Sequence, residues 1–255
     1  MAAPYNAASL PADVTLSRAY GRNALSPALI RLFVAAREAY DWPKGTGSAV
    51  SQQRIIDLEA FVRTRLTALS LSSAHEIVKE VSHWAGNNAK SHFQIIAYSK
   101  QHQDLLQGAI VDLMDPARLS VGINSLCTLP GINLVIASKV YRFCAPMTGA
   151  AIDRHASYFF NSLHDAGNAH CTSFLREWAN GRHTSSRLAI YSTRGFSQNR
   201  DEYLNTYLPL LEHIALELNA RSVRYRCAAT GNKKDWAPAD VEMAAYYWWA
   251  CNGER

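Results

Sequence analysis

A short segment in the middle of the chain combines a tight turn with the start of an apolar helix. It reads Leu129-Pro130-Gly131-Ile132-Asn133 and continues as an apolar stretch to Lys139. Gly131 and Asn133 are residue types that tolerate left-handed backbone angles, so the pattern predicts a turn between two helices. The first amides of the second helix would then point outward and accept a phosphate oxygen, assisted by the helix dipole. A plain helical hairpin is the alternative interpretation.

About twenty residues beyond this turn, Asp153 and His155 stand at the expected start of another helix. The hairpin and the spaced aspartate resemble the helix-hairpin-helix DNA glycosylase superfamily, whose hairpin reads Leu-Pro-Gly, a hydrophobic residue and Gly. Here Asn133 replaces the second Gly of that pattern. The 8-oxoguanine DNA glycosylase branch has its catalytic residue in an Asp-x-His motif, which Asp153 and His155 match. The resemblance covers roughly residues 80–165.

The resemblance implies an enzyme that flips a base out of duplex DNA and breaks its N-glycosidic bond, leaving an abasic site. Bifunctional members carry a nucleophilic lysine four residues after the first glycine of the hairpin, and this chain has Val135 there. We therefore expect a monofunctional glycosylase that uses water. Lys139 lies one helical turn beyond Val135 on the same face, so it either reaches the same cleft or is a surface lysine.

Under this resemblance, Asp153 would stabilise the positive charge that develops on the sugar and would orient or deprotonate the attacking water. The same residue type is also a good helix N-cap. His155 would contact a phosphate, although a partly buried helical histidine is the alternative. Asn87 and Asn88 resemble the asparagines of this branch that enter the duplex where the base has left. The DNA-binding residues implied are Gly131, Asn133, Arg154, His155, Asn87, Asn88 and Lys90.

A flipped base needs a pocket, and aromatic side chains stack on such bases. The C-terminal run Tyr246–Trp249 is dense in them, and we name Trp248 and Trp249 as candidates, with the hydrophobic core as the alternative for each. Trp42 and Trp84 are lesser candidates. Small residues at 149–151, beside Asp153, would suit a roomy pocket.

No cofactor is expected to be required. The hairpin of the superfamily often holds a monovalent cation on backbone carbonyl groups, and by position these would belong to Cys127, Leu129 and Ile132. The substrate base stays open: either an oxidised base such as 8-oxoguanine, or a hypermodified phage base such as glucosylated hydroxymethylcytosine, since some bacterial antiphage glycosylases are similar in architecture.

Two alternatives to a glycosylase remain. One is a non-catalytic helix-hairpin-helix protein that binds double-stranded DNA. Asp153 argues against it, because an anion near phosphate weakens binding. The other is an unrelated helical enzyme with a chance Leu-Pro-Gly turn.

The elements that must position these residues are mostly helical. We expect an all-α fold with at most a small two-stranded β element and a cleft between two helical lobes. An irregular arm would cover residues 1–25 and one helical domain residues 26–255, with the hairpin and Asp153 inside 121–165. The ribbon would join residues 188–192 and 222–228. Helices are predicted to start at Ser26-Pro27, at a Ser73–Glu76 capping box, near Asn88, at Leu105, at Asp153, at residue 199 with a kink at Pro209, and at Asp240.

The composition is that of a globular chain. The 255 residues are 48% hydrophobic and 18% charged, which excludes a disordered or coiled-coil chain. The net charge of +5 permits a polyanionic partner without requiring one. Five cysteines without a C-x-x-C pair argue against a disulfide framework and fit a reducing cytoplasm. No apolar run reaches the length of a membrane span. We expect a cytoplasmic monomer that binds DNA and no membrane.

Overall fold

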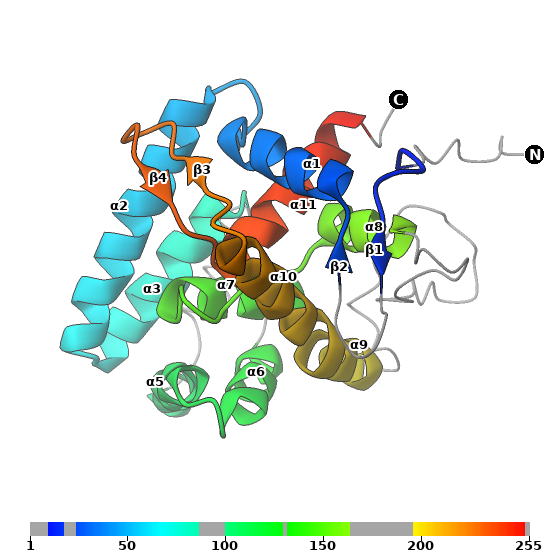
Figure 1. Ribbon diagram of the computed structural model, residues 1–255. Helices are drawn as coiled ribbons and strands as arrows, with labels where there is room; N and C mark the ends of the chain where they lie inside the picture. The colour runs from blue at the N-terminus through cyan, green and yellow to red at the C-terminus, as the bar shows by residue number, and fades with distance from the viewer. Residues whose placement is uncertain (1–9, 18–23, 87–99, 130–131, 164–195, 253–255) are drawn as a thin grey trace, which may run out of the picture.

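The computed structural model describes residues 10–17, 24–86, 100–129, 132–163 and 196–252, and these residues are mainly helical (Figure 1). The mainly α-helical class is confirmed, while the described residues hold two small β-ribbons where at most one two-stranded element was expected. The helices are α1 Pro27–Glu38, α2 Ser48–Thr67, α3 Leu71–Trp84, α5 Lys100–Met114, α6 Leu119–Thr128, α7 Leu134–Cys144, α8 Arg154–Ser162, α9 Phe196–Glu202, the π-helix η2 Tyr203–Tyr207, α10 Leu208–Ala220 and α11 Pro238–Asn252.

Four short strands form two antiparallel ribbons within the described residues. β1 (Leu16–Ser17) pairs with β2 (Ala24–Leu25), and β3 (Tyr225–Arg226) pairs with β4 (Lys233–Lys234). Within 222–228, the described strand β3 pairs with residues 233–234, reached through a local turn in which Gly231 has φ +71°. Residues 188–192 lie outside the described part of the chain.

The described residues of the N-terminal arm, 10–17 and 24–25, contribute to the core, and residues 16–17 and 24–25 form a short ribbon where an irregular arm was expected. Leu10, Val14, Leu16 and Leu25 are at most 3% exposed. The apolar side chains of this segment bury themselves against the helical domain, and the β1–β2 pairing satisfies part of its backbone.

The helix starts predicted at Ser26-Pro27 and at Asp153 have the predicted capping chemistry. The Ser26 hydroxyl accepts a hydrogen bond from the Leu29 amide, and Pro27 occupies the first turn of α1. Helix α3 starts earlier than predicted: its N-cap is Ser70, whose hydroxyl accepts from the Ser73 amide at 3.2 Å. The Ser73 hydroxyl in return accepts from the Ser70 amide, so Ser73 is the third residue of the helix instead of its cap.

The helix predicted over residues 199–219 is interrupted where the kink was expected. Pro209 lies in the first turn of α10, and the π-helix η2 immediately precedes it. The last helix begins at Pro238, two residues before the predicted N-cap. Asp240 lies in its first turn and accepts a hydrogen bond from the Ala237 amide at 3.0 Å.

The helices pack in two groups (Figure 1). Helices α2, α3, α5, α6 and α7 contact one another, and α1, α8, α10 and α11 form a second group in which α11 packs against the other three. The segment that joins α7 to α8 passes from the first group to the second.

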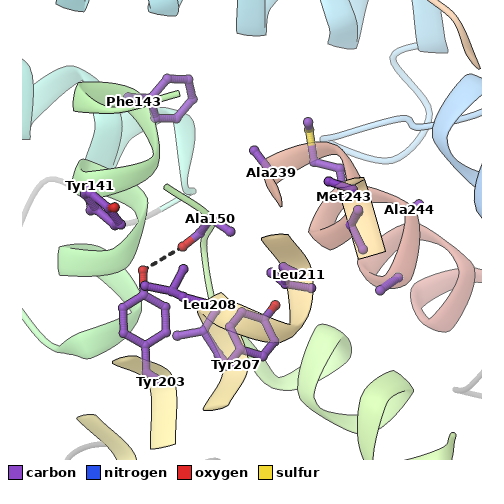
Figure 2. Packing of buried hydrophobic residues seen from close by; sticks show 14 of the residues in the cluster. Tyr141, Phe143, Ala150, Tyr203, Tyr207, Leu208, Leu211, Ala239, Met243 and Ala244 are labelled. Carbon is purple, nitrogen blue, oxygen red and sulfur yellow. Dashed lines mark hydrogen bonds between the residues drawn. The ribbon is translucent and has the colours of Figure 1, made fainter. Parts of the chain in front are cut away.

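This joining segment is packed tightly. A Cβ on Gly149 would lie 2.8 Å from both the Arg142 Cα and the Tyr141 carbonyl oxygen. The Tyr203 hydroxyl donates to the Ala150 carbonyl oxygen at 2.7 Å (Figure 2). Ala150 is fully buried. Gly149 and Ala150 therefore serve close packing and do not line a pocket, whereas Ala151, the third small residue named, lines the pocket described below.

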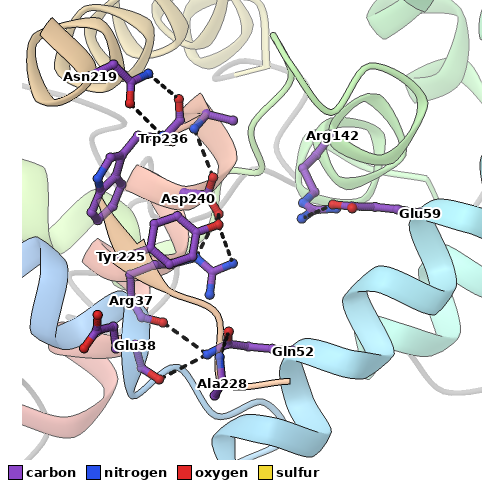
Figure 3. A network of polar contacts seen from close by, with 11 residues as sticks. Arg37, Glu38, Gln52, Glu59, Arg142, Asn219, Tyr225, Ala228, Trp236 and Asp240 are labelled. Atoms are coloured by element: carbon purple, nitrogen blue, oxygen red, sulfur yellow. Dashed lines mark hydrogen bonds and ion pairs between the residues drawn. The ribbon is translucent and has the colours of Figure 1, made fainter. Parts of the chain in front are cut away.

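A buried polar network holds the second group together and joins it to α2 (Figure 3). Arg37 donates to the Asp240 carboxylate at 2.8 Å, and the Tyr225 hydroxyl donates to the same oxygen at 2.8 Å. Gln52 of α2 donates to the Arg37 carbonyl oxygen and accepts from the Ala228 amide. These bonds join side chains and backbone groups of different elements, which fixes α1, α2 and α11 relative to each other.

Candidate functional site

A pocket of about 200 Å³ lies where the two groups of helices meet. Its walls come from the end of α3, the middle of α7, the start of α8, the first half of α11 and the segment after α1. The lining residues are Tyr40, Trp42, Trp84, Ala85, Lys139, Ala151, Asp153, His155, Glu242 and Tyr246. Two predicted site residues of different helices, Asp153 and Lys139, thus meet in one pocket.

Asp153 is held in position by backbone contacts on both sides. It is the N-cap of α8, with an extended backbone (φ −147°), and its Oδ1 accepts from the Ala156 amide at 3.0 Å. The preceding residue, Ile152, donates its amide to the Ser138 hydroxyl on α7 at 3.0 Å. The N-cap bond thus fixes the Asp153 carboxyl group at the pocket wall, beside the N-terminus of α8.

Lys139 reaches the pocket, in agreement with the first of its two predicted interpretations. Its Nζ lies 5.8 Å from the ring centroid of Trp84, a cation–π contact. Val135, one turn earlier on α7, is partly buried against the core and does not line the pocket.

The aromatic walls of the pocket are continuous. Tyr246 is in edge contact with Trp42 at 5.6 Å and with His155 at 5.2 Å between ring centroids. The Trp42 indole N–H donates to the Trp84 carbonyl oxygen at 3.1 Å. The lesser candidates Trp42 and Trp84 thus line the pocket, and His155 lies inside it.

The main aromatic candidates lie elsewhere. Trp249 is 4% exposed and packs near Tyr158 at 5.8 Å, while Trp248 packs against Phe159 at 5.7 Å. Consecutive residues of a helix point in different directions, and in this run Tyr246 is the one that faces the pocket. Neither lines this pocket: Trp249 is a core residue, which was the alternative interpretation, and Trp248 is partly buried and lines a separate surface pocket near α1.

Glu242 is a site residue that the sequence reasoning missed. It lies on α11 one turn before Tyr246, on the same face, and is only 5% exposed. Burial, and secondarily the nearby charge of Asp153, raise the pKa of its carboxyl group to about 8. The available signal was a lone acidic residue in the apolar run Val241–Ala245.

The hairpin is capped differently from the prediction. Asn133 has φ −103°, so it is not left-handed. It is the N-cap of α7, and its side-chain oxygen accepts from the Ile136 amide at 3.0 Å. One of the amides proposed to bind phosphate is therefore already occupied.

Several predicted DNA contacts are not tested. Gly131, Asn87, Asn88 and Lys90 lie outside the described residues. Arg154 begins α8, but its side chain is not among those described. The DNA-binding role of these residues stays a prediction.

The predicted cation site has one carbonyl group engaged by the protein itself. The Leu129 carbonyl oxygen accepts a hydrogen bond from the Ile132 amide at 3.1 Å. Cys127 lies in the last turn of α6, and the two residues between Leu129 and Ile132 fall outside the described chain. These contacts give no independent support for a cation, which stays an implication of the resemblance. Within the described ranges, no group of three or more His, Cys, Asp or Glu residues is arranged to hold a metal ion.

A second, larger pocket adjoins the first. It has a volume of about 520 Å³ and shares Trp42 and Trp84 with the smaller pocket. Phe61 and Leu58 of α2 add apolar surface, and polar groups come from Arg54, Asp57, Glu80 and His83. The two pockets therefore share a wall formed by Trp42 and Trp84, and the larger one has mixed apolar and polar walls.

No protein-family model, curated protein or solved structure matches this chain. In the part of the chain that the structure describes, no helix is both long enough and apolar enough to cross a membrane.

Proposed function

We propose that this protein is a monofunctional DNA glycosylase that hydrolyses the N-glycosidic bond of a modified base flipped out of duplex DNA. The observation that carries the proposal is the position of Asp153, held by the N-terminus of α8 at the wall of a small aromatic pocket. The Leu-Pro-Gly hairpin before α7 supports it from the sequence.

The pocket suits one flipped base. Its volume of about 200 Å³ lies below the roughly 300–1,000 Å³ of pockets for drug-sized ligands, so a single planar ring system is the appropriate occupant. Trp42, Trp84 and Tyr246 offer aromatic faces or edges to such a ring. Stacking in the pocket would repay part of the free energy needed to unstack the base from the duplex.

Asp153 would act on the sugar. When the glycosidic bond breaks, positive charge develops on C1′ and the ring oxygen of the sugar, and a nearby fixed carboxylate stabilises it. The same carboxylate would accept a proton from the water that attacks C1′. Because α8 and the bond from Ile152 to Ser138 fix this carboxylate beforehand, little reorganisation is needed during the reaction.

The adjoining pocket favours a base with a large substituent. A substituent on the ring would extend past Trp42 and Trp84 into the second volume of about 520 Å³. This supports a hypermodified base such as glucosylated hydroxymethylcytosine over 8-oxoguanine, which adds a single oxygen atom to guanine.

The test is base release by the purified protein and by Asp153→Asn. Duplexes carrying each modified base would be incubated and then treated with alkali, which cleaves at abasic sites. We expect Asp153→Asn to lose at least about 100-fold in rate, the scale of one electrostatic stabiliser. Asparagine is an equally good N-cap, so the melting temperature should change little.

A matched control is Asp235→Asn, which removes an exposed carboxylate paired with Arg224. It should leave base release unchanged. Equal rates for Asp153→Asn and the unmodified protein would remove Asp153 from the mechanism. Salt-dependent DNA binding without any abasic product would instead favour a non-catalytic DNA-binding protein.

A further inference from the structure

We propose that Glu242 is the general acid of this site and delivers the proton that the base takes when the glycosidic bond breaks. The inference rests on the proposed function and adds to it a second catalytic carboxyl group.

Two carboxyl groups line the same pocket from different helices. Asp153 enters from the N-terminus of α8 and Glu242 from the interior of α11. The pocket of about 200 Å³ is small enough that one flipped nucleotide would present its sugar to Asp153 and its base to Glu242.

The environments of the two groups are opposite. Asp153 is partly exposed, accepts the Ala156 amide and lies at the positive end of a helix. Glu242 is 5% exposed and lies beyond the first turn of α11, among the buried residues Val241, Met243 and Ala244. A pair of carboxyl groups in such different surroundings divides into one base and one acid, as in other hydrolases of sugar bonds.

The other groups around Glu242 modulate its protonation without cancelling the effect of burial. Those that interact electrostatically with it come from every neighbouring element: Asp153 of α8, Lys139 and Arg142 of α7, Arg37 of α1, Tyr40 after α1, and Tyr203 and Tyr207 of η2. Both arginines already have carboxylate partners, Arg142 with Glu59 at 2.9 Å (Figure 3) and Arg37 with Asp240 at 2.8 Å. The raised pKa of Glu242, about 8, keeps it protonated at neutral pH.

The step balances as a hydrolysis. The bond between C1′ and the base nitrogen breaks, and its electron pair goes to the base. The Glu242 carboxyl group gives its proton to an acceptor nitrogen or oxygen of that base and becomes a carboxylate. The oxygen of water forms a bond to C1′, and the proton it releases goes to Asp153. Lys139, in the same pocket, stabilises the new negative charge on Glu242. Glu242 then regains a proton from solvent, and Asp153 releases its proton to solvent.

This role predicts a dependence on the leaving base. A neutral base that departs without protonation leaves as an anion, so it needs the acid. A base alkylated on its ring nitrogen, such as 7-methylguanine, is already cationic and leaves as a neutral molecule. The acid should therefore matter for the first kind of base and hardly for the second.

The test compares Glu242→Gln and Glu242→Asp with the unmodified protein in single-turnover base release from pH 5 to pH 10. The probes are duplexes containing 8-oxoguanine, glucosylated hydroxymethylcytosine and 7-methylguanine. On the neutral bases that are excised, we expect Glu242→Gln to lose about 100-fold in rate. The rate of the unmodified protein should fall as pH rises through about 8, and this alkaline limb should be absent from Glu242→Gln and retained by Glu242→Asp.

The outcomes separate the inference from the proposed function. If the unmodified protein releases no base from any duplex, both the proposed function and the general-acid role of Glu242 are refuted. If it releases bases and Glu242→Gln keeps its rate, or keeps the alkaline limb, only the general acid falls. An equal loss on the neutral bases and on 7-methylguanine would make Glu242 a structural residue of the pocket.

Discussion

The buried carboxyl group of Glu242 should make the protein less stable as pH rises. The folded state holds its proton up to a pKa of about 8, whereas an ordinary glutamate loses it near 4.5. Between these two values the folded state binds more protons than the unfolded state, so the free energy of unfolding falls with increasing pH. Glu242→Gln keeps the shape of the side chain and removes the titration.

The magnitude follows from the difference between the two pKa values. The penalty that the carboxyl group imposes is about 1 kcal/mol at pH 5 and about 3 kcal/mol at pH 7, at roughly 1.4 kcal/mol for each pH unit above the unfolded pKa. Glu242→Gln should therefore stabilise the fold by about 3 kcal/mol at pH 7. For a chain of this size that corresponds to a rise in melting temperature of roughly 6–12 °C.

Thermal unfolding at pH 5, 6, 7 and 8 would measure this effect. The matched control is Glu212→Gln on α10, where the carboxylate is exposed and the melting temperature should stay the same. A stabilisation by Glu242→Gln that is equal at pH 5 and pH 8 would refute the titration argument. A lower stability of Glu242→Gln at pH 7 would show that the ionised Glu242 carboxylate stabilises the folded state.

Three further predictions address packing, the ion pair and the lysine. Asp240→Asn leaves the buried Arg37 without its anionic partner and should cost about 3 kcal/mol in chemical denaturation; a loss below about 1 kcal/mol would contradict this. Gly149→Ala should destabilise the folded state by about 1–3 kcal/mol, because the new Cβ would lie 2.8 Å from backbone atoms. Gly108→Ala on α5, where a Cβ would meet open space, should stabilise the folded state by about 0.5–1 kcal/mol. The opposite order of these two would disprove the packing argument. Lys139→Met should slow base release, and the abasic strand should remain the main product. Borohydride should trap no covalent protein–DNA adduct with the unmodified protein. An adduct that forms only when Lys139 is present would identify this lysine as a nucleophile.

The sequence predicted those features that depend on local chemistry. Ser26-Pro27 and Asp153 start helices because their side chains satisfy amides one turn further on. Pro209 lies in the first turn of α10, directly after the π-helix η2, where its missing amide is tolerated. Lys139 and Asp153 line the same pocket because a short, tightly packed segment joins α7 to α8.

Features that depend on long-range packing were not predictable in the same way. Which aromatic residue of α11 faces the pocket depends on the rotation of α11 about its own axis where it packs against α1 and α8. The presence of Trp248 and Trp249 in an aromatic run does not indicate that rotation. Glu242 was missed because its meaning arises only when α11 brings it beside Asp153. Asn133 was expected to be left-handed, yet its capping bond to the Ile136 amide requires the extended backbone that it has.

The most direct test of the central claim is base release from a panel of duplexes, each with one modified base, by the unmodified protein and by Asp153→Asn. Strands would be resolved with and without alkali treatment. The account predicts an intact strand before alkali, cleavage at the modified position after alkali, and a loss of at least about 100-fold with Asp153→Asn. The absence of alkali-labile sites in every duplex, or undiminished release by Asp153→Asn, would contradict it.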